Sequence, residues 1–376
     1  MKRLVATITS LFLILYAKPS FCEGFERVQK KESNQPTWGQ KFARLIGLNN
    51  YKRSYALVIG ISNYKGYGYL PSENDPKKVA QYLFEEADFD YVHTLTDEKA
   101  SKEKIEKLMV DFFPSELDSN DRFLFYWSGH GVTRSVREGK RGYLPLASTP
   151  DNKSYSRMVS MDDISRWDGL LEASQTLYIL DSCFSGLAGG QHKGHARKLT
   201  TQQLTKPSRQ ILTAGREGEV ALVFEDLGGS LFTVALLEGM RGAADTSSGN
   251  FERDGVISVN ELELYVKKRV GWELDKRQSK LKKSRTMTPQ LRDLDFSDGE
   301  FFFLTDSIIF SSPKPPAYAY PFPPYKIYSK SDNRTKNQKT TNYQRQHMNL
   351  AHCVRAFSPQ HIPLFRGYNL DSQAQA

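Results

Sequence analysis

Along the middle of the chain, short unbroken apolar runs alternate with segments in which apolar residues recur every three or four positions. Unbroken runs are typical of strands buried on both faces of a sheet, and helical spacing is typical of helices with one buried face. We predict strands at residues 55–61, 91–97, 121–131, 175–183, 208–215 and 299–306. We predict helices at residues 74–89, 101–113, 160–171, 229–242 and 258–270. This alternation predicts an α/β fold, with a mostly parallel six-stranded sheet and helices on both faces.

The two ends of the chain depart from this pattern. Residues 1–22 begin with Lys2 and Arg3, continue with an apolar stretch too short to cross a bilayer, and end in small residues. That order is typical of a secretory signal peptide. We therefore expect an exported protein, periplasmic or extracellular, with no stable membrane span after signal removal. We assign residues 23–53 to a linker, 54–306 to one domain and 307–376 to a tail.

The tail is rich in proline and tyrosine. It is predicted to be disordered, because proline is excluded from the interior of a helix or a sheet ladder. The tail also carries most of the net charge of +9, so the domain itself is nearly neutral. Since the domain has no basic face interleaved with aromatic residues, we expect no nucleic-acid partner. The tail could instead dock a partner protein.

Cysteine is rare in this chain, with three in 376 residues. Cys22 lies in the predicted signal peptide and Cys353 lies in the tail. The cysteines are therefore too few and too scattered to form a disulfide framework. Cys183 ends a predicted strand in the stretch DSCFSG, and His130 ends another in the stretch SGHG. Because the carboxyl ends of parallel strands share one edge of a sheet, adjacent strands would bring this thiol and this imidazole together.

A thiol beside an imidazole can carry out nucleophilic catalysis. The thiolate is the nucleophile, and the histidine accepts its proton and later returns it to a leaving amine. Gly129 and Gly131 are expected to let the backbone turn sharply beside the substrate, and the amides of Gly131 and Cys183 could hold a developing oxyanion. The sequence therefore predicts catalytic roles for His130, Cys183 and Gly131.

SGHG and DSCFSG, together with ALVIGISNY, LPSENDPKKVAQYL and SLFTVALLEGMRG, resemble the caspase-like cysteine peptidases. The resemblance is closer to metacaspases and bacterial caspase-like proteins than to animal caspases, and it runs from Ser54 to Leu304. It implies a caspase-like fold and a cysteine endopeptidase with Cys183 as nucleophile and His130 as base, requiring no cofactor. Phe184 stands where many metacaspases have histidine, and we expect this difference to tune the rate.

The resemblance also implies a substrate class. In metacaspases an acidic pocket selects arginine or lysine on the acyl side of the cleaved bond, and the matching positions here are Asp75, Ser128 and Asp181. Two carboxylates in a recessed site favour a cation and repel an acid. We therefore expect protein or peptide partners with arginine or lysine at the cleaved position. A helix cap at Asp75 and a structural acceptor at Asp181 are the alternatives.

The basic segment 191–209 matches this predicted specificity. We predict that it is a linker in which the protein cleaves itself. The alternative is a basic loop that is simply solvated.

Residues 250–261 have the ligand spacing of a calcium-binding EF-hand loop. Asn250, Glu252, Asp254 and Glu261 would supply side-chain oxygens, and Gly255 occupies the position that must turn sharply. Calcium is therefore the metal that this sequence could bind. A structural turn between two helices is the alternative.

The alternative function is a catalytically silent caspase-like module that binds or scaffolds other proteins. The presence of both His130 and Cys183 argues against it, because a silent module needs neither side chain.

Overall fold

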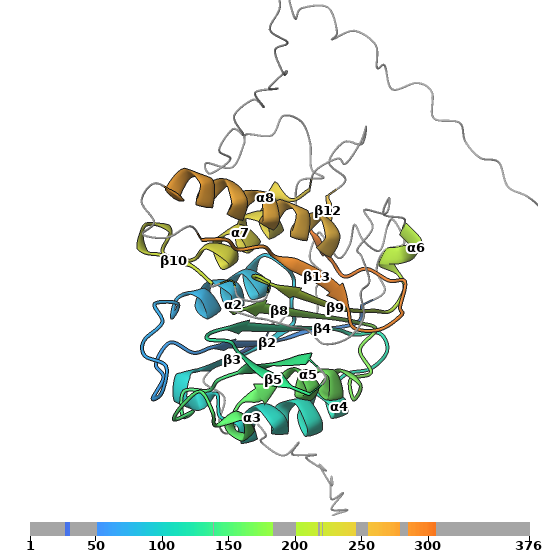
Figure 1. Cartoon of the computed structure of the whole chain (residues 1–376). Coiled ribbons are helices and arrows are strands. Elements are labelled where there is room, and N and C mark those ends of the chain that lie inside the picture. Colours follow the sequence, from blue (N-terminus) through green and yellow to red (C-terminus); the bar gives the residue numbers. More distant parts are fainter. Residues whose placement is uncertain are drawn as a thin grey trace, which may run out of the picture. The chain divides into compact units, whose positions relative to one another are not determined.

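The computed structural model describes residues 51–137, 139–182, 201–216, 219, 221–245, 255–278 and 285–305, and the backbone of 27–30. Within these residues the main sheet has the strand order β1-β3-β2-β4-β8-β9-β13 (Figure 1). Its strands are β1 (Arg27–Lys30), β2 (Ser54–Gly60), β3 (Tyr91–Thr96), β4 (Arg122–Ser128), β8 (Gln175–Asp181), β9 (Ser208–Thr213) and β13 (Gln290–Asp293). The neighbours from β3 to β9 pair in parallel, and β1 and β13 are antiparallel at the two edges. The predicted α/β fold with a mostly parallel sheet is confirmed.

Helices cover both faces of this sheet, as the sequence predicted (Figure 1). One face carries α2 (Asp75–Glu85), α7 (Leu231–Glu238) and α8 (Val259–Arg277). The other carries α3 (Lys102–Glu106), α4 (Phe113–Glu116) and α5 (Met161–Asp168), with a π-helical segment at Lys107–Phe112 joining α3 to α4. A second π-helical segment, Gly239–Ala243, extends α7. Short helical pieces lie at Thr201–Leu204 (α6), Asp97–Lys99, Tyr155–Arg157 and Glu225–Leu227.

The alternation of side chains along each central strand supplies both hydrophobic cores. In β4, Tyr126 packs into the core under α2, α7 and α8, while Phe125 and Trp127 pack into the core under α3 and α5. Every residue of β2, β4 and β8 is buried. This burial on both faces is why these strands read as unbroken apolar runs in the sequence.

Two parts of the sheet differ from the prediction. The apolar run predicted as the sixth strand, 299–306, contains β14 (Phe302–Leu304), which leaves the main sheet and pairs with β12 (Val256–Ser258). The strand that takes this place at the edge of the main sheet is β13, which pairs with β9. It is partly buried and has the sequence QLRD, which contains no apolar run that would have predicted it. The segment assigned to a linker contains β1, which pairs with β3.

The structure contains smaller strands that the sequence did not predict, in the segments after β4 and before α7. After β4 the chain forms β5 (Val132–Val136), β6 (Gly139–Leu144) and β7 (Val159–Ser160). Before α7 it forms a hairpin of β10 (Val223–Phe224) and β11 (Gly229–Ser230). Within the described residues, no helix has the length and apolarity needed to span a membrane.

Candidate active site

The strand that leads to His130 lies directly beside the strand that leads to Cys183. β4 and β8 are parallel neighbours in which Ser128 pairs with Asp181. Beyond that pair, the Gly129 N–H donates to the Asp181 carbonyl oxygen at 3.2 Å. The predicted adjacency of these two strand ends is therefore confirmed. Cys183 lies outside the described residues, and the chain is described up to the preceding Ser182, so the sulfur-to-imidazole geometry stays a prediction.

His130 is held mainly by aromatic neighbours. Its backbone N–H donates to the Tyr64 hydroxyl at 2.8 Å, and its ring lies 4.8 Å from the Tyr64 ring and 5.7 Å from the Tyr67 ring, between centroids. Partial burial lowers the pKa of His130, which favours the neutral imidazole. Its Nε2 is buried and accepts or donates no hydrogen bond within the described part of the chain. A neutral ring with an unengaged nitrogen is the form that a general base requires.

Gly129 serves a purpose that the sequence did not indicate. We expected Gly129 and Gly131 to provide a sharp turn, and the backbone bends at Gly129, although neither glycine has a positive φ. A Cβ built on Gly129 would lie 2.4 Å from the Tyr64 hydroxyl oxygen. The missing side chain therefore leaves room for the hydroxyl that holds the His130 backbone.

The three predicted specificity residues lie together, as the sequence predicted. Asp75 is the first residue of α2, and its Oδ2 accepts the Ser230 N–H at 3.0 Å. Asp181 Oδ2 accepts the Thr233 hydroxyl at 2.6 Å. Asp75, Ser128 and Asp181 are all buried, with exposed fractions of 0%, 1% and 2%. Helix α2, strands β4 and β8 and the start of α7 thus enclose the pair of carboxyl groups, here called the acid pair (Asp75 and Asp181).

Burial disfavours the ionised form of both carboxyl groups of the acid pair, and neither group is fully hydrogen-bonded within the described residues. Burial, reinforced by the charge of Asp181, raises the pKa of Asp75 to about 7. Burial also raises the pKa of Asp181 to about 6. Each group has one carboxylate oxygen, Oδ1, without a hydrogen bond in the described residues. An incoming cation would supply both the missing partner and the charge that allows both groups to ionise.

The β10–β11 hairpin covers this pair. A Cβ built on Gly229 would lie 2.1 Å from Asp75 Oδ1, so the hairpin backbone sits directly against the carboxyl group. The Lys78 ammonium donates to the Gly228 carbonyl at 2.6 Å. Arg277, at the end of α8, donates to both carboxylate oxygens of Asp226 at 2.9 and 2.6 Å. The cover of the acid pair is thus tied to two helices.

Sequence reasoning missed Tyr64, Ser230 and Thr233. Thr233 had a usable signal, because it is a lone polar residue inside the apolar run LFTVALL of a helix that is buried almost all round. Its hydroxyl also lies 2.6 Å from the Tyr126 hydroxyl, which extends the polar cluster into the core. Tyr64 and Ser230 had no such signal, since both act through contacts between distant segments.

The predicted calcium loop is only partly described. Asn250, Glu252 and Asp254 lie outside the described residues. Gly255 has φ +76°, in agreement with the sharp turn expected of it, and its N–H donates to a buried Asp245 carboxylate at 3.1 Å. Glu261 accepts from the Ser258 N–H at the start of α8 and so caps that helix. Within the described residues no cluster of metal-ligating side chains is present, so calcium binding stays a prediction.

A family model described as caspase domain matches residues 53–293 of the chain. Solved structures that resemble it include a protein of Geobacter sulfurreducens, 16% identical with a TM-score of 0.42, which covers 64% of this chain and 93% of that one. Another is caspase-1 from Spodoptera frugiperda, 15% identical with a TM-score of 0.41, covering 71% of this chain and 93% of that one. No curated protein sequence matches the chain.

Proposed function

Since this chain belongs to the caspase-domain family, we propose that it is a cysteine endopeptidase that uses Cys183 and His130. The observation that carries the proposal is the register of β4 and β8, which sets Ser128 opposite Asp181 two residues before each of the proposed catalytic side chains. Adjacent strands lie about 4.8 Å apart, so loops leaving these ends start within reach of one substrate bond.

In the proposed reaction, the neutral His130 imidazole removes the proton of the Cys183 thiol, and the thiolate sulfur attacks the carbonyl carbon of the scissile peptide bond. The carbonyl oxygen becomes an oxyanion, for which the Gly131 amide is the proposed donor. The C–N bond then breaks as His130 gives its proton to the leaving amine, which leaves a thioester on Cys183. Water attacks the thioester with His130 as base, and the acid product and the free thiol are released.

We propose arginine or lysine as the residue on the acyl side of the bond. Asp75 and Asp181 each have a buried oxygen without a hydrogen bond in the described residues, and Ser128 pairs with Asp181 two residues before His130. A guanidinium or ammonium group would pair with these oxygens, whereas an aspartate side chain would add a third carboxyl group to a buried acidic site.

The direct test uses peptidyl-aminocoumarin substrates that differ only at the cleaved position, with arginine, lysine, leucine or aspartate. We expect turnover of the arginine and lysine substrates under reducing conditions and none by Cys183→Ala or His130→Ala. Cys353→Ala is the matched control, since it removes a thiol that has no proposed role. Absence of turnover by the native chain, with and without calcium, would favour a silent binding module.

We also propose self-cleavage within 191–209, because its basic residues match the proposed specificity. The native chain and Cys183→Ala would be incubated in parallel and the products mapped by mass spectrometry. Fragments ending after arginine or lysine in this segment are expected from the native chain alone. Equal nicking of both chains would point to a contaminating protease.

Calcium binding by residues 250–261 remains a proposal that can be tested separately. Titration calorimetry would compare the native chain with Asp254→Asn, which removes one proposed ligand charge. Heat uptake or release that is lost in the variant is expected. No binding at millimolar calcium would leave this segment as a structural turn.

A further inference from the structure

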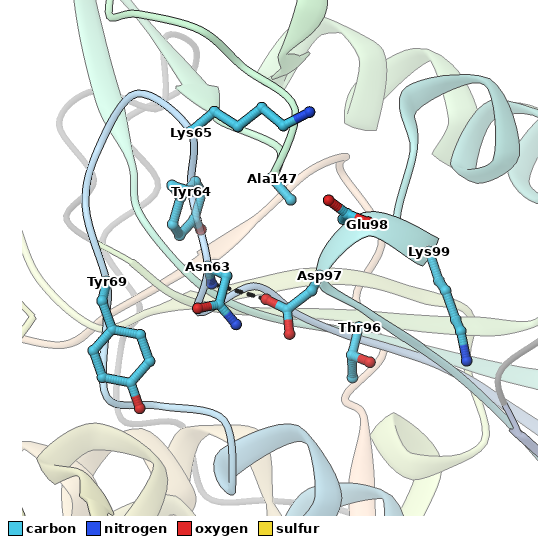
Figure 2. Close-up of a pocket in the computed structure, with 9 residues that line it drawn as sticks. All are labelled: Asn63, Tyr64, Lys65, Tyr69, Thr96, Asp97, Glu98, Lys99 and Ala147. Atoms are coloured by element: carbon cyan, nitrogen blue, oxygen red, sulfur yellow. Dashed lines mark hydrogen bonds between the residues drawn. The ribbon is translucent and has the colours of Figure 1, made fainter.

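A cavity lies at the carboxyl ends of β2 and β3 (Figure 2). One of its lining residues, Tyr64, also contacts His130. Its volume is ≈ 660 Å³, within the range of sites that bind small molecules or peptide side chains. It is lined by Asn63, Tyr64, Lys65, Tyr69, Thr96, Asp97, Glu98, Lys99 and Ala147. We call it the leaving-side cavity, for the reason given below.

The segments that line this cavity are joined by hydrogen bonds in which backbone N–H groups are the donors. Asp97 Oδ1 accepts the N–H groups of Ser62 and Asn63 at 2.9 and 2.8 Å, which joins the loop after β3 to the loop after β2. Figure 2 shows the contact between Asn63 and Asp97 across the floor of the cavity. The Lys65 N–H donates to the Ala147 carbonyl at 3.0 Å and fixes a third segment. Three separate segments that line the cavity are therefore linked to one another by hydrogen bonds.

Asp97 adopts a backbone conformation that costs energy. Its φ is +44°, one of two positive values among the described non-glycine residues. Such conformations cost about 1 kcal/mol and occur disproportionately at functional sites. In this conformation the Asp97 carboxylate accepts two backbone N–H groups of the loop after β2.

The position of the cavity relative to His130 follows from the strand order. Tyr64 lines the cavity and is also the residue whose hydroxyl and ring hold His130. The cavity lies at the ends of β2 and β3, while β8, which leads to Cys183, lies on the opposite side of β4. In the proposed reaction His130 protonates the leaving amine. The peptide after the scissile bond would therefore start on the His130 side of the site, next to Tyr64 and the cavity that Tyr64 lines.

The distances identify which residues of the substrate would reach the cavity. With strands about 4.8 Å apart, the ends of β2 and β3 lie about 5 and 10 Å from the end of β4. An extended peptide advances about 3.3 Å per residue. The second and third residues after the scissile bond therefore fall over the leaving-side cavity.

The charges of the cavity are balanced. Lys65 and Lys99 contribute two ammonium groups, and Asp97 and Glu98 contribute two carboxylates. Neither the Lys65 nor the Glu98 side chain has an ion pair or hydrogen bond within the described part of the chain. A charged substrate side chain would be attracted by one wall and repelled by the other. A neutral side chain that both donates and accepts hydrogen bonds, such as a carboxamide, can use both.

We infer that the leaving-side cavity binds the second and third residues after the scissile bond of a peptide substrate and favours neutral polar side chains there. The inference rests on the proposed peptidase function. It makes the protein selective on both sides of the bond, through the acid pair on the acyl side and through this cavity on the leaving side.

The test uses internally quenched peptides with arginine at the cleaved position and glutamine, lysine or aspartate at the second and third positions after the bond. The readout is the ratio of kcat/KM values between two peptides for one enzyme, so that general effects of a variant on folding or on catalysis cancel. Only cleavage at the arginine bond, identified by mass spectrometry, is counted, because lysine is also a proposed cleavage residue. For the native chain we expect the glutamine peptide to exceed both charged peptides by about fivefold, the size of exposed charge effects.

Charge reversal in the cavity should redirect this preference. Lys65→Glu should raise the lysine-to-glutamine ratio by about fivefold, and Glu98→Lys should raise the aspartate-to-glutamine ratio by a similar factor. Lys268→Glu makes the same charge change on an exposed residue of α8 and should leave both ratios as in the native chain.

Two failures can be told apart. If the aminocoumarin substrates, which have no residues after the bond, are not turned over at all, the proposed peptidase function fails and this inference fails with it. If they are turned over but the ratios are the same in all four proteins, the peptidase function stands and the leaving-side cavity has no role in specificity.

Discussion

Cleavage after arginine should depend on pH in a way that cleavage after citrulline does not. Citrulline has the shape of arginine but carries no charge, so it can occupy the same pocket without needing a counter-ion. Arginine needs an ionised carboxylate, and burial together with Asp181 raises the pKa of Asp75 to about 7. Below that pH, Asp75 is mostly protonated in the free protein, and binding of arginine must first release the proton.

The size of the effect follows from the fraction of Asp75 that is ionised. With a pKa of about 7, that fraction falls about tenfold between pH 8 and pH 6. The ratio of kcat/KM for arginine to kcat/KM for citrulline should therefore fall about tenfold over this interval. Titration of His130 or of the thiol affects both substrates equally and cancels in the ratio.

Asp75→Asn is the decisive variant, because asparagine keeps the shape and removes the titrating group. At pH 8 we expect it to lower the ratio by about 10- to 100-fold, the usual cost of losing a buried hydrogen bond to a charged group. The remaining pH dependence should move down to about pH 6, where Asp181 titrates. A ratio that is flat from pH 8 to pH 6 in the native chain, or a slope that is unchanged in Asp75→Asn, would show that Asp75 does not meet the substrate cation.

Four further predictions concern the stability of the fold and the residues around the site. Gly229→Ala puts a methyl group 2.1 Å from Asp75 Oδ1 and should lower the free energy of unfolding by about 1–3 kcal/mol in urea titrations. Gly271→Ala, in a helical position with open space, should raise it by about 1 kcal/mol. Tyr64→Phe leaves the His130 N–H without its acceptor and should lower kcat about tenfold, with circular dichroism reporting an unchanged fold. Burial raises the pKa of Glu300 to about 7, so the stabilising contribution of its protonated form is lost as the pH rises through 7. Between pH 5.5 and 8.5 the native chain should lose about 2 kcal/mol of unfolding free energy relative to Glu300→Gln, and parallel pH profiles would contradict the assignment.

The central strands were predicted well because a strand that is buried on both faces consists almost entirely of apolar residues, and such a run can be recognised in the sequence. β2, β4 and β8 are buried along their whole length, and no amphipathic helix produces such runs. The edges were harder to predict. β13 is half-buried and polar, so its pairing with β9 depends on tertiary contacts rather than on its own residues. The apolar run containing β14 is buried for a different reason, since it pairs with β12 outside the main sheet.

Some residues of the candidate site could likewise be predicted from the sequence, and others could not. The position of His130 could be predicted because ligand-binding residues of parallel sheets follow the carboxyl ends of strands, whereas Ser128 and Asp181 were named from the family resemblance. Tyr64 and Ser230 could not, because each acts on a residue at least 66 positions away, and such pairings are set by the fold. The chain bends at Gly129 as expected, but nothing in the sequence indicated that the small size of Gly129 is also needed by Tyr64, a residue from another loop.

The polar cluster under the β10–β11 hairpin is difficult to explain as a stabilising feature. Asp75 and Asp181 are buried, repel each other when ionised, and each leave one oxygen without a hydrogen bond in the described residues. An unsatisfied buried polar atom costs about 1–3 kcal/mol, and apolar residues of similar volume would avoid that cost. Gly229 lies against one of these oxygens, and Lys78 bonds the neighbouring carbonyl rather than the carboxylate. In the proposed function, a substrate cation would supply the partner that these two oxygens lack. The cost of burying the acid pair would then be compensated on binding, which would favour arginine or lysine as proposed above.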